Sequence, residues 1–324
     1  MTVLVVGGNG QLGAACCREL RSRGEAVRAT VRDRSRGADL EGVELVELDL
    51  VHHTPADAAA ALTGVDAVVL SANAVAPRAG DDVGAFAEGL SRFVDAAASH
   101  GVRRAVLPSV PMPPGPPTAA VVRAKQALEL QLTRSPLQGR LLRLPPFMEA
   151  WFALVGSSLP LRGEAHATID RPSPFLQRFR AATGTLVEDR GVMLVPGSPR
   201  HRHAFLSVAD AARAVAEAAV RERVTAAPIE VAGPEVLSWQ DVAALFADVL
   251  GRRVRVLSTP GLVYRGMAVA LRPVAAVPAL TMELNAYIAG VESPWTDVGG
   301  GLVDPATMHT AEAFLRAKAA LPAA

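Results

Sequence analysis

The sequence predicts an α/β fold, in which a doubly wound parallel sheet is followed by a smaller, mostly helical C-terminal domain. Three observations predict this fold. Short apolar runs alternate with helical patterns over the first half of the chain, which is typical of βαβ units around a parallel sheet. A glycine-rich loop joins the first apolar run to the first helical pattern. After Pro145 the alternation ends.

The expected strands of the first half are short and mostly apolar, as in a sheet that is covered on both faces. They are Thr2–Val6, Ala26–Val31, Val43–Leu48, Ala67–Leu70, Arg104–Leu107 and Gly139–Leu144. The helical patterns between them are Leu12–Arg23, Ala56–Leu62, Val83–Ser99 and Thr118–Thr133. This order predicts parallel strands with helices on both faces of the sheet.

The second half has a different pattern. Residues 146–204 contain scattered proline, glycine and arginine with few clear strands, and residues 258–324 are mostly helical and apolar. The elements expected between them are the strands Phe205–Val208, Ile229–Val231 and Arg253–Leu257 and the helices Ala211–Val220 and Trp239–Leu250, the latter capped by Ser238. We expect one domain over residues 1–150, completed by about 205–232, and a second over 151–204 and 233–324.

The composition argues against several classes of protein. The chain has 33 basic and 32 acidic residues and a net charge of +1, so no nucleic-acid partner is expected. Cys16 and Cys17 are neighbours on an expected helix and do not face each other, so no disulfide framework is implied. The apolar stretch Met267–Met282 is interrupted by an arginine and two prolines. We expect a cytoplasmic protein without a leader segment or a membrane partner.

The loop after the first expected strand predicts a dinucleotide site. Gly8, Gly10 and Gly13 have the spacing G-x-G-x-x-G between a strand and a helix. The glycines allow a tight turn and a close approach of the pyrophosphate, and the helix N-terminus offers free N–H groups. The residues expected to contact the cofactor are Gly7, Gly8, Asn9, Gly10, Gln11, Leu12 and Gly13. The alternative is a βα turn that needs glycine only for its own geometry.

The end of the second strand favours NADP(H) over NAD(H). An acidic residue in this region holds the ribose 2′-hydroxyl in NAD sites. Here Arg32 follows the strand directly, and Arg36 lies four residues later. A guanidinium suits a 2′-phosphate. Asp33 remains an alternative ribose ligand, and a solvated basic turn is the alternative without a cofactor.

These motifs resemble the short-chain dehydrogenase/reductase superfamily, in its atypical, NmrA-like branch that binds NAD(P)H. The resemblance extends over most of the chain. Its further pieces are Leu48–Leu50, Val68–Asn73, Lys125–Glu129, Leu142–Glu149, Phe205–Ala212 and Val231–Glu235. It implies a Rossmann fold with a seven-stranded doubly wound sheet and a smaller C-terminal substrate domain.

The resemblance also implies roles for residues at the strand ends. Asp49, with Leu50 beside it, would contact the adenine. Ser71, Ala72 and Asn73 would line the nicotinamide ribose.

One position departs from the family pattern. Standard members carry a tyrosine four residues before the active-site lysine, on the same helical face, and the lysine lowers the pKa of that tyrosine. Here that position is Val121, and the only tyrosines are Tyr264 and Tyr287. Sugar epimerase or dehydratase chemistry that depends on the tyrosine is therefore not expected.

Lys125 remains as the candidate catalytic residue, with Ser109. In isoflavone-reductase-like members, which this branch resembles, a lysine without the tyrosine serves as acid or base. The alternatives are that Lys125 only hydrogen-bonds the nicotinamide ribose, or that it is a surface lysine. Ser109 occupies the position where the family often has a serine that orients a carbonyl, although Pro108 beside it is unusual.

Other candidate sites are weaker. The pairs His52-His53 and His201/His203 have no accompanying ligand cluster, so no metal is expected. No G-x-S-x-G motif supports an esterase. Phe147, Met148, Trp151 and Phe152 follow the sixth strand, and they form either an apolar substrate pocket or the core between the domains.

The leading functional hypothesis is an NADPH-dependent reductase of a small, largely apolar carbonyl, quinone or conjugated alkene. A non-catalytic NADP(H)-binding redox sensor is the second hypothesis, because Val121 replaces the tyrosine. A biosynthetic tailoring enzyme with non-standard chemistry is the third. The expected partner is a small-molecule substrate, and both a monomer and a homodimer remain open.

Overall fold

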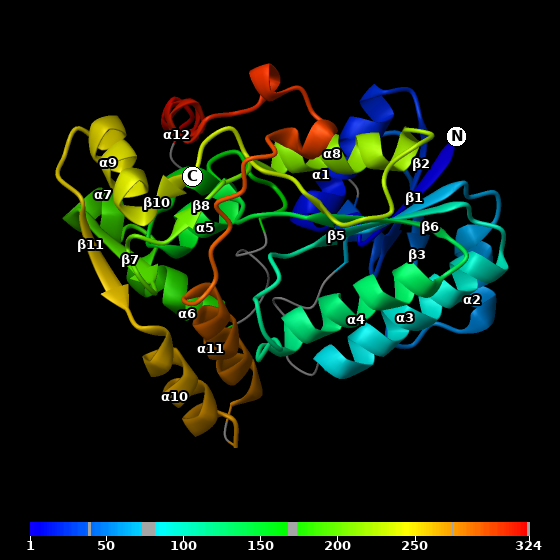
Figure 1. Ribbon diagram of the computed structural model, residues 1–324, viewed down its shortest axis with the longest axis horizontal. Coiled ribbons are helices and arrows are strands. Elements are labelled where there is room, and N and C mark those ends of the chain that lie inside the picture. The colour runs from blue at the N-terminus through cyan, green and yellow to red at the C-terminus, as the bar shows by residue number, and fades with distance from the viewer. Residues whose placement is uncertain (38–39, 73–81, 168–173, 274, 323–324) are drawn as a thin grey trace.

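The fold is built around a seven-stranded, entirely parallel sheet with the strand order β3-β2-β1-β4-β5-β6-β9 (Figure 1). The computed structural model describes residues 1–324 except 38–39, 73–81, 168–173, 274 and 323–324. The strands are β1 (Thr2–Val6), β2 (Ala26–Val31), β3 (Glu44–Glu47), β4 (Ala67–Leu70), β5 (Arg104–Ser109), β6 (Gln138–Arg143) and β9 (Ile229–Glu230). The predicted seven-stranded Rossmann sheet is confirmed.

Two helical layers cover this sheet. Helices α1 (Gln11–Ser22) and α8 (Val208–Val220) lie on one face, and α2 (Pro55–Leu62), α3 (Val83–Ser99) and α4 (Ala120–Arg134) cover the other (Figure 1). Alternate residues of β1 enter the two cores, since side chains alternate across a strand. Val3 and Val5 pack with α1 and α8, whereas Leu4 and Val6 pack with α2, α3 and α4.

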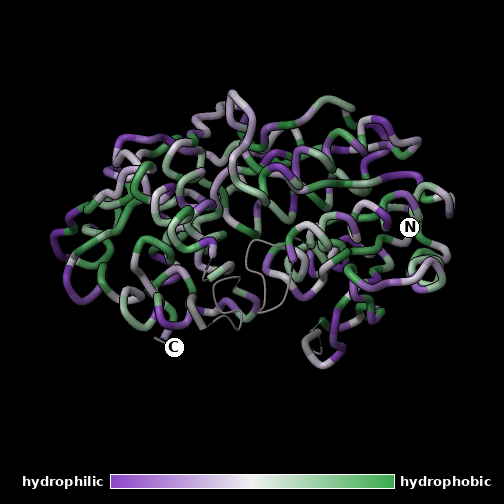
Figure 2. The backbone as a smooth tube through the Cα atoms, turned by 90° about the horizontal axis from the view of Figure 1, so that it is seen from below, coloured by the Kyte–Doolittle hydropathy of each residue, from purple (hydrophilic) through white to green (hydrophobic). Residues whose placement is uncertain are grey.

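The C-terminal part has a separate aromatic core. The ring centroid of Phe152 lies 5.0 Å from that of Phe205, 6.0 Å from that of Phe246 and 6.3 Å from that of Phe314. Figure 2 shows two lobes side by side, with hydrophobic stretches running through both. The helices of this part are α5 (Met148–Leu154), α6 (Pro174–Thr183), α7 (Leu186–Arg190), α9 (Trp239–Leu250), α10 (Gly261–Leu271), α11 (Ala276–Ile288) and α12 (Ala311–Ala319). Its two-stranded sheets pair β7 (Val192–Pro196) with β11 (Arg255–Thr259) and β8 (Arg202–His203) with β10 (Leu237–Ser238).

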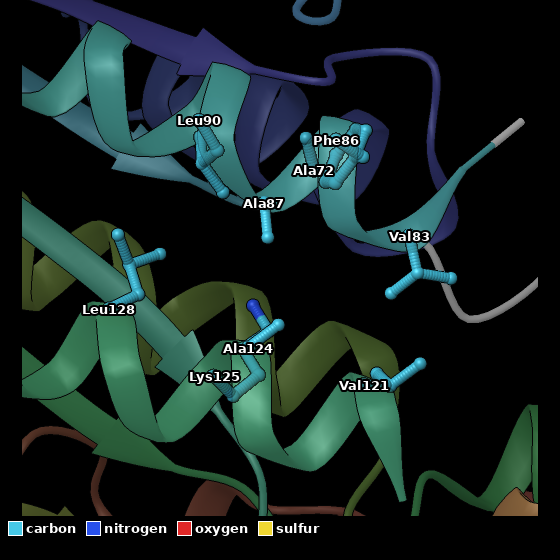
Figure 3. A pocket seen from close by; sticks show the side chains of 9 residues that line it. All are labelled: Ala72, Val83, Phe86, Ala87, Leu90, Val121, Ala124, Lys125 and Leu128. Atoms are coloured by element: carbon cyan, nitrogen blue, oxygen red, sulfur yellow. The ribbon is translucent and has the colours of Figure 1, made fainter.

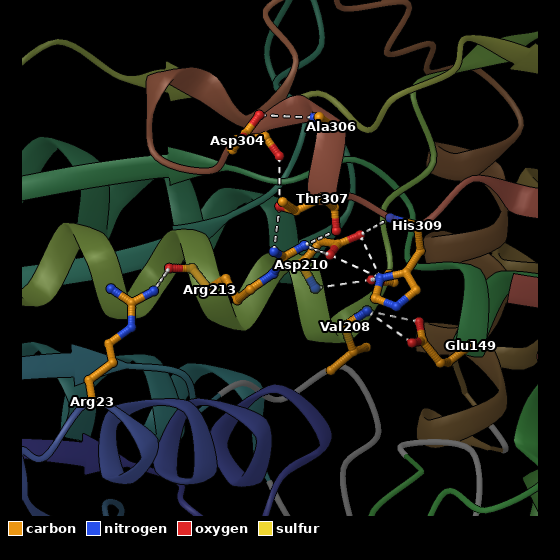
Figure 4. Close-up of polar contacts among 10 residues, drawn as sticks. Arg23, Glu149, Val208, Asp210, Arg213, Asp304, Ala306, Thr307 and His309 are labelled. Atoms are coloured by element: carbon orange, nitrogen blue, oxygen red, sulfur yellow. Dashed lines mark hydrogen bonds and ion pairs between the residues drawn. The ribbon is translucent and has the colours of Figure 1, made fainter. Parts of the chain in front are cut away.

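A polar network fastens the C-terminal segment to α8 (Figure 4). The Asp210 carboxylate accepts the His309 backbone N–H at 2.9 Å and contacts His309 Nδ1 at 3.0 Å. It also pairs with Arg213, whose guanidinium donates to the Thr307 hydroxyl at 2.7 Å. Arg23, at the end of α1, donates to the Arg213 carbonyl oxygen at 3.4 Å. The network therefore joins α1, α8 and the C-terminal segment.

Several expected elements differ from those observed. The expected strand Phe205–Val208 is wrong, because only Leu206 forms an isolated bridge, with Phe147, and Ser207 caps α8. Residues 146–204 contain α5, α6, α7 and β7, where few clear elements were expected. Their apolar residues are shared between helices and a short strand, so no single period extends far enough to be recognised. Over the described residues, no helix is long and apolar enough to cross a bilayer.

Candidate functional site

The glycine loop between β1 and α1 is shaped by close approaches of its backbone. Gly7 has φ +82°, and a Cβ there would lie 2.8 Å from the Ala72 Cβ. A Cβ on Gly8 would lie 2.5 Å from the Ala29 Cβ. At Gly13 it would lie 2.2 Å from the Gly7 carbonyl oxygen. Each of these contacts is too short for a side chain, so the loop needs glycine at these positions.

The N-terminus of α1 has no side-chain cap. Gly10 is the N-cap residue, and the Ala14 N–H donates to its carbonyl oxygen at 2.8 Å. The N–H groups of the first helical turn have no partner within the helix. Asn9 and Leu12 of the loop are partly exposed, and Gln11 is buried. An uncapped helix end behind a glycine turn is the arrangement that suits a phosphate or pyrophosphate.

Arg32 and Asp49 lie at the ends of neighbouring strands. Arg32 follows β2 and Asp49 follows β3, and both are exposed. Burial opposes ionisation of Asp49, but hydrogen bonds from His52 and the Val51 N–H and the charge of Arg32 together lower its pKa. The two residues are therefore close enough to interact electrostatically.

The remaining predicted cofactor residues differ in their surroundings. Ser71 donates to the Val6 carbonyl oxygen at 2.8 Å and so joins the ends of β1 and β4. Ala72 packs against the glycine loop, while Leu50 is buried in the core under α3. Arg36 lies in a short 3₁₀-helix, Arg34–Gly37, but its side chain is outside the described residues. Asn73 also lies outside them.

Lys125 lies in a small, otherwise apolar pocket between α3 and α4 (Figure 3). The other side chains of the pocket include Ala72, Val83, Phe86, Leu90, Val121 and Leu128. Lys125 is only 8% exposed, and burial lowers its pKa to about 8, against a smaller opposing effect of Glu129. Its Nζ donates to the Pro108 carbonyl oxygen at 2.8 Å. Lys125 is therefore not a surface lysine.

Val121 lies one helical turn before Lys125 and lines the same pocket (Figure 3). It is 5% exposed. The position that carries tyrosine in the standard pattern thus presents a buried isopropyl group. At this position the pocket has no phenol that could exchange a proton.

Ser109 is the last residue of β5 and follows the proline that accepts the Lys125 hydrogen bond. Its Oγ is buried and has no hydrogen-bond partner among the described residues. An unpaired buried hydroxyl is costly, so it is a candidate to bind a ligand atom. The structure thus brings together the ends of β1 to β5 at one edge of the sheet, where ligands bind in open α/β folds.

One residue beside this edge was not singled out from the sequence. Tyr287 of α11 donates its phenolic hydrogen to the Pro111 carbonyl oxygen, two residues beyond Ser109. The two partners are 176 positions apart. No local pattern could have linked them.

Residues 7–142 match the model of the NAD(P)H-binding family. They contain the glycine loop, the ends of β2 to β5 and Lys125. Residues 7–142 are an NAD(P)H-binding domain. The resemblance predicted from the motifs is confirmed for this domain and for the fold.

Similar proteins extend this result. The chain is 32% identical over 169 aligned positions to 3-diazoavenalumate denitrifying reductase from Streptomyces sp.. That match covers 44% of this chain, and it spans only 55% of the relative's length.

Solved structures share the fold over nearly the whole chain. The NADPH-dependent quinone oxidoreductase of Escherichia coli is 19% identical with a TM-score of 0.67, covering 97% of this chain and 98% of its own. The triphenylmethane reductase of Citrobacter sp., complexed with NADP(H), is 15% identical with a TM-score of 0.71, covering 98% and 99%.

The apolar residues after β6 belong mostly to the core rather than to the pocket. Met148 and Phe152 are fully buried, and Trp151 stacks on Trp239 with a centroid distance of 6.1 Å. Phe147 packs against the core that α1 and α8 form. None of the four is among the side chains of the Lys125 pocket.

The predicted histidine pairs make separate contacts. His52 Nδ1 lies 3.1 Å from the Asp49 carboxylate, and His53 Nδ1 lies 2.9 Å from the Leu50 carbonyl oxygen. His203 is fully buried and hydrogen-bonds Ser293 at 3.0 Å. Among the described residues, no three side chains with metal-ligating groups cluster together.

Proposed function

We propose that this protein is an NADPH-dependent reductase of a small, largely apolar carbonyl, quinone or conjugated alkene. One observation carries the proposal: a buried lysine lies in an apolar pocket at the edge of the NAD(P)H-binding domain where its strands end. Ala72 lines this pocket and also packs against the glycine loop. Reductases among the similar proteins support the same class of reaction.

The glycine loop and α1 would hold the pyrophosphate, and Arg32 and Arg36 would favour the 2′-phosphate of NADP(H). Arg32→Ala is expected to weaken NADPH binding by roughly tenfold or more, the usual effect of losing a charge-assisted hydrogen bond. NADH affinity is expected to change little. Calorimetry with both nucleotides measures this. Arg18→Ala, an exposed arginine on α1, is the matched control, and equal losses for NADPH and NADH would contradict the role of Arg32.

The bound cofactor would supply hydride. Lys125 would donate a proton, or a hydrogen bond, to the acceptor atom that gains negative charge. Its pKa of about 8 keeps the amine largely protonated at neutral pH and able to release a proton. Ser109 would orient the same atom through its otherwise unpaired hydroxyl. The apolar walls would exclude water and accommodate the remainder of the substrate.

Lys125→Met distinguishes the two roles considered for this lysine. If Lys125 donates a proton, kcat is expected to fall roughly a hundredfold with an unchanged Kd for NADPH. If it binds only the nicotinamide ribose, the Kd is expected to rise. In the protein with Lys125, kcat should fall as the pH rises through about 8, because a neutral amine is a poorer acid.

The reductase proposal is tested by following NADPH oxidation with a panel of carbonyls, quinones and conjugated alkenes. A diazo compound belongs in the panel, because the Streptomyces relative is named for a diazo compound. Turnover of at least one class is expected. NADPH binding without turnover of any panel member would contradict the proposal.

The redox-sensor hypothesis is favoured by one observation, the buried Val121 at the position of the usual tyrosine. It predicts that NADP+ and NADPH bind with different affinities and that a partner protein responds to the difference. Equal affinities by calorimetry and no captured partner would contradict it.

A further inference from the structure

The segment between β5 and α4 contains few backbone donors. Five of the ten residues 110–119 are proline, and proline has no N–H group. The segment therefore cannot hold its position through a regular ladder of backbone hydrogen bonds. Its carbonyl groups remain available, and buried carbonyls need donors from elsewhere in the protein.

Two side chains donate to carbonyl groups of this segment, and a third donates to the end of β5 that precedes it. Lys125 donates to the Pro108 carbonyl oxygen at 2.8 Å. Arg123 donates to the carbonyl oxygen of Thr118, and Tyr287 to that of Pro111. The first two belong to α4, which the segment itself leads into, so Tyr287 is the anchor that comes from the C-terminal part.

Tyr287 reaches the segment from α11, which lies beside it. Figure 1 shows the segment between β5 and α4 running down beside α11, the helix that carries Tyr287. Burial raises the pKa of the Tyr287 phenol, so the group stays protonated and remains a donor. Pro111 is itself buried. Ser109, with its unpaired buried hydroxyl, lies between the carbonyl groups that Lys125 and Tyr287 hold.

We propose that Tyr287 is a positioning residue, which holds Ser109 and the Pro108 carbonyl in place against Lys125 by anchoring the proline-rich segment to α11. This inference rests on the proposed reductase function. Removing the phenolic hydroxyl leaves the buried Pro111 carbonyl without this donor, and prolines along the segment cannot offer an N–H in its place. The segment then shifts, and a small misplacement of a catalytic group has a large effect on rate.

The first test needs no turnover, because the chain has only two lysines, Lys125 and Lys318. Trace acetylation of the whole protein with acetic anhydride, followed by mass spectrometry, gives a labelling rate for each amine. In Tyr287→Phe the rate for Lys125 is expected to rise roughly tenfold, the factor for one ordinary hydrogen bond. Lys318, which pairs with Glu164 in the C-terminal part, should keep its rate. Tyr264→Phe, the other tyrosine, should leave both rates unchanged.

The second test uses the reaction. With a substrate found in the panel, Tyr287→Phe is expected to lower kcat roughly tenfold with little change in KM or in the Kd for NADPH. An unchanged labelling rate at Lys125, or an equal rise at Lys318, would overturn the inference. So would faster labelling of Lys125 with an unchanged kcat. If the parent protein turns over nothing, the reductase proposal fails, and the labelling rates still decide whether Tyr287 holds the segment.

Discussion

At the scale of single residues, the site depends on positions where an ordinary side chain is excluded or displaced. Of the glycines in the loop, Gly13 has the least room for a side chain, because a Cβ there would lie 2.2 Å from the Gly7 carbonyl oxygen. Val121 contributes a small, buried apolar side chain to the pocket one helical turn before Lys125. Lys125 is buried in the same pocket as Val121, and burial is the main cause of its lowered pKa.

The Gly13→Ala change is expected to abolish cofactor binding and to destabilise the fold. The added methyl group would lie 2.2 Å from the Gly7 carbonyl oxygen and 2.9 Å from the Ser71 Oγ, so the helix or the loop must move, at a cost of about 1–3 kcal/mol or more. Calorimetry with NADPH and urea unfolding measure both effects. Gly266→Ala is the control, because its Cβ would enter open space on α10 and alanine favours helix. Normal cofactor binding by Gly13→Ala would contradict this account of the loop.

At the scale of elements, α8 is the helix that both parts of the molecule share. Its cap is built by Ser207, which accepts the Asp210 N–H, and by Glu149, whose two carboxyl oxygens lie 3.0 Å from the Val208 nitrogen. A carboxylate at a helix N-terminus is favourable, but Glu149 is only 4% exposed. Burial dominates and raises its pKa to about 7.

Glu149 makes stability depend on pH in a defined direction. A carboxyl group whose pKa is about 4.5 in the unfolded chain and about 7 in the folded protein binds its proton more tightly when folded. Below about pH 4.5 the protonated carboxyl group makes its full contribution to the free energy of unfolding. This contribution, at most about 3 kcal/mol, is lost as the pH rises to about 7. Glu149→Gln, which stays neutral, should lack this fall in the free energy of unfolding.

Urea unfolding between pH 4.5 and 8 measures this difference. His309 changes the free energy of unfolding in the same direction. Its hydrogen bond to Asp210 raises the pKa of the imidazole, so its stabilising effect is lost as the pH rises through that pKa. His309→Gln is therefore the control that separates the two groups. An identical pH dependence in Glu149→Gln and the parent protein would show that Glu149 is not the group concerned.

At the scale of the whole molecule, the C-terminal chain completes the core of the NAD(P)H-binding part. Strand β9 pairs with β6 as the last strand of the sheet. Leu302, Val303 and Met308 are each 8% exposed and pack into the core formed by β1, α1 and α8. The backbone of Gly299 donates to the Ala232 carbonyl oxygen at 2.9 Å.

A chain that ends at Pro228 is therefore expected to fold poorly. It would lack β9 and would expose the apolar surface that Leu302, Val303 and Met308 cover. Losing three such contacts costs about 5 kcal/mol or more, which is comparable with the whole stability of many domains. Thermal unfolding followed by circular dichroism measures this. A cooperative transition at the temperature of the full chain would show that residues 1–228 are self-sufficient.

The elements with strong local signals were predictable from the sequence. The βαβ order, the glycine loop and the capped helix α9 depend on periodicity, on glycine spacing and on a serine at an N-cap, and each of these acts over a few residues. The same order predicts which residues lie together at one edge of the sheet, because parallel strands all end at that edge. These residues are Arg32, Asp49, Ser71 and Ser109. The expected strand Phe205–Val208 is wrong, because Phe205 and Leu206 are buried without forming a regular strand and α8 begins at Val208.

The amino-acid sequence was enough to predict the class of fold, the position of the glycine loop and the presence of valine at position 121. These properties are encoded by residues close together along the chain. Three contacts became known from the folded chain alone: Lys125 donates to the Pro108 carbonyl oxygen, Glu149 caps α8, and Tyr287 donates to the proline-rich segment. Those contacts join positions 17, 59 and 176 residues apart. They exist because packing of the helices and the sheet excludes water and leaves each buried polar group to find its partner across the fold.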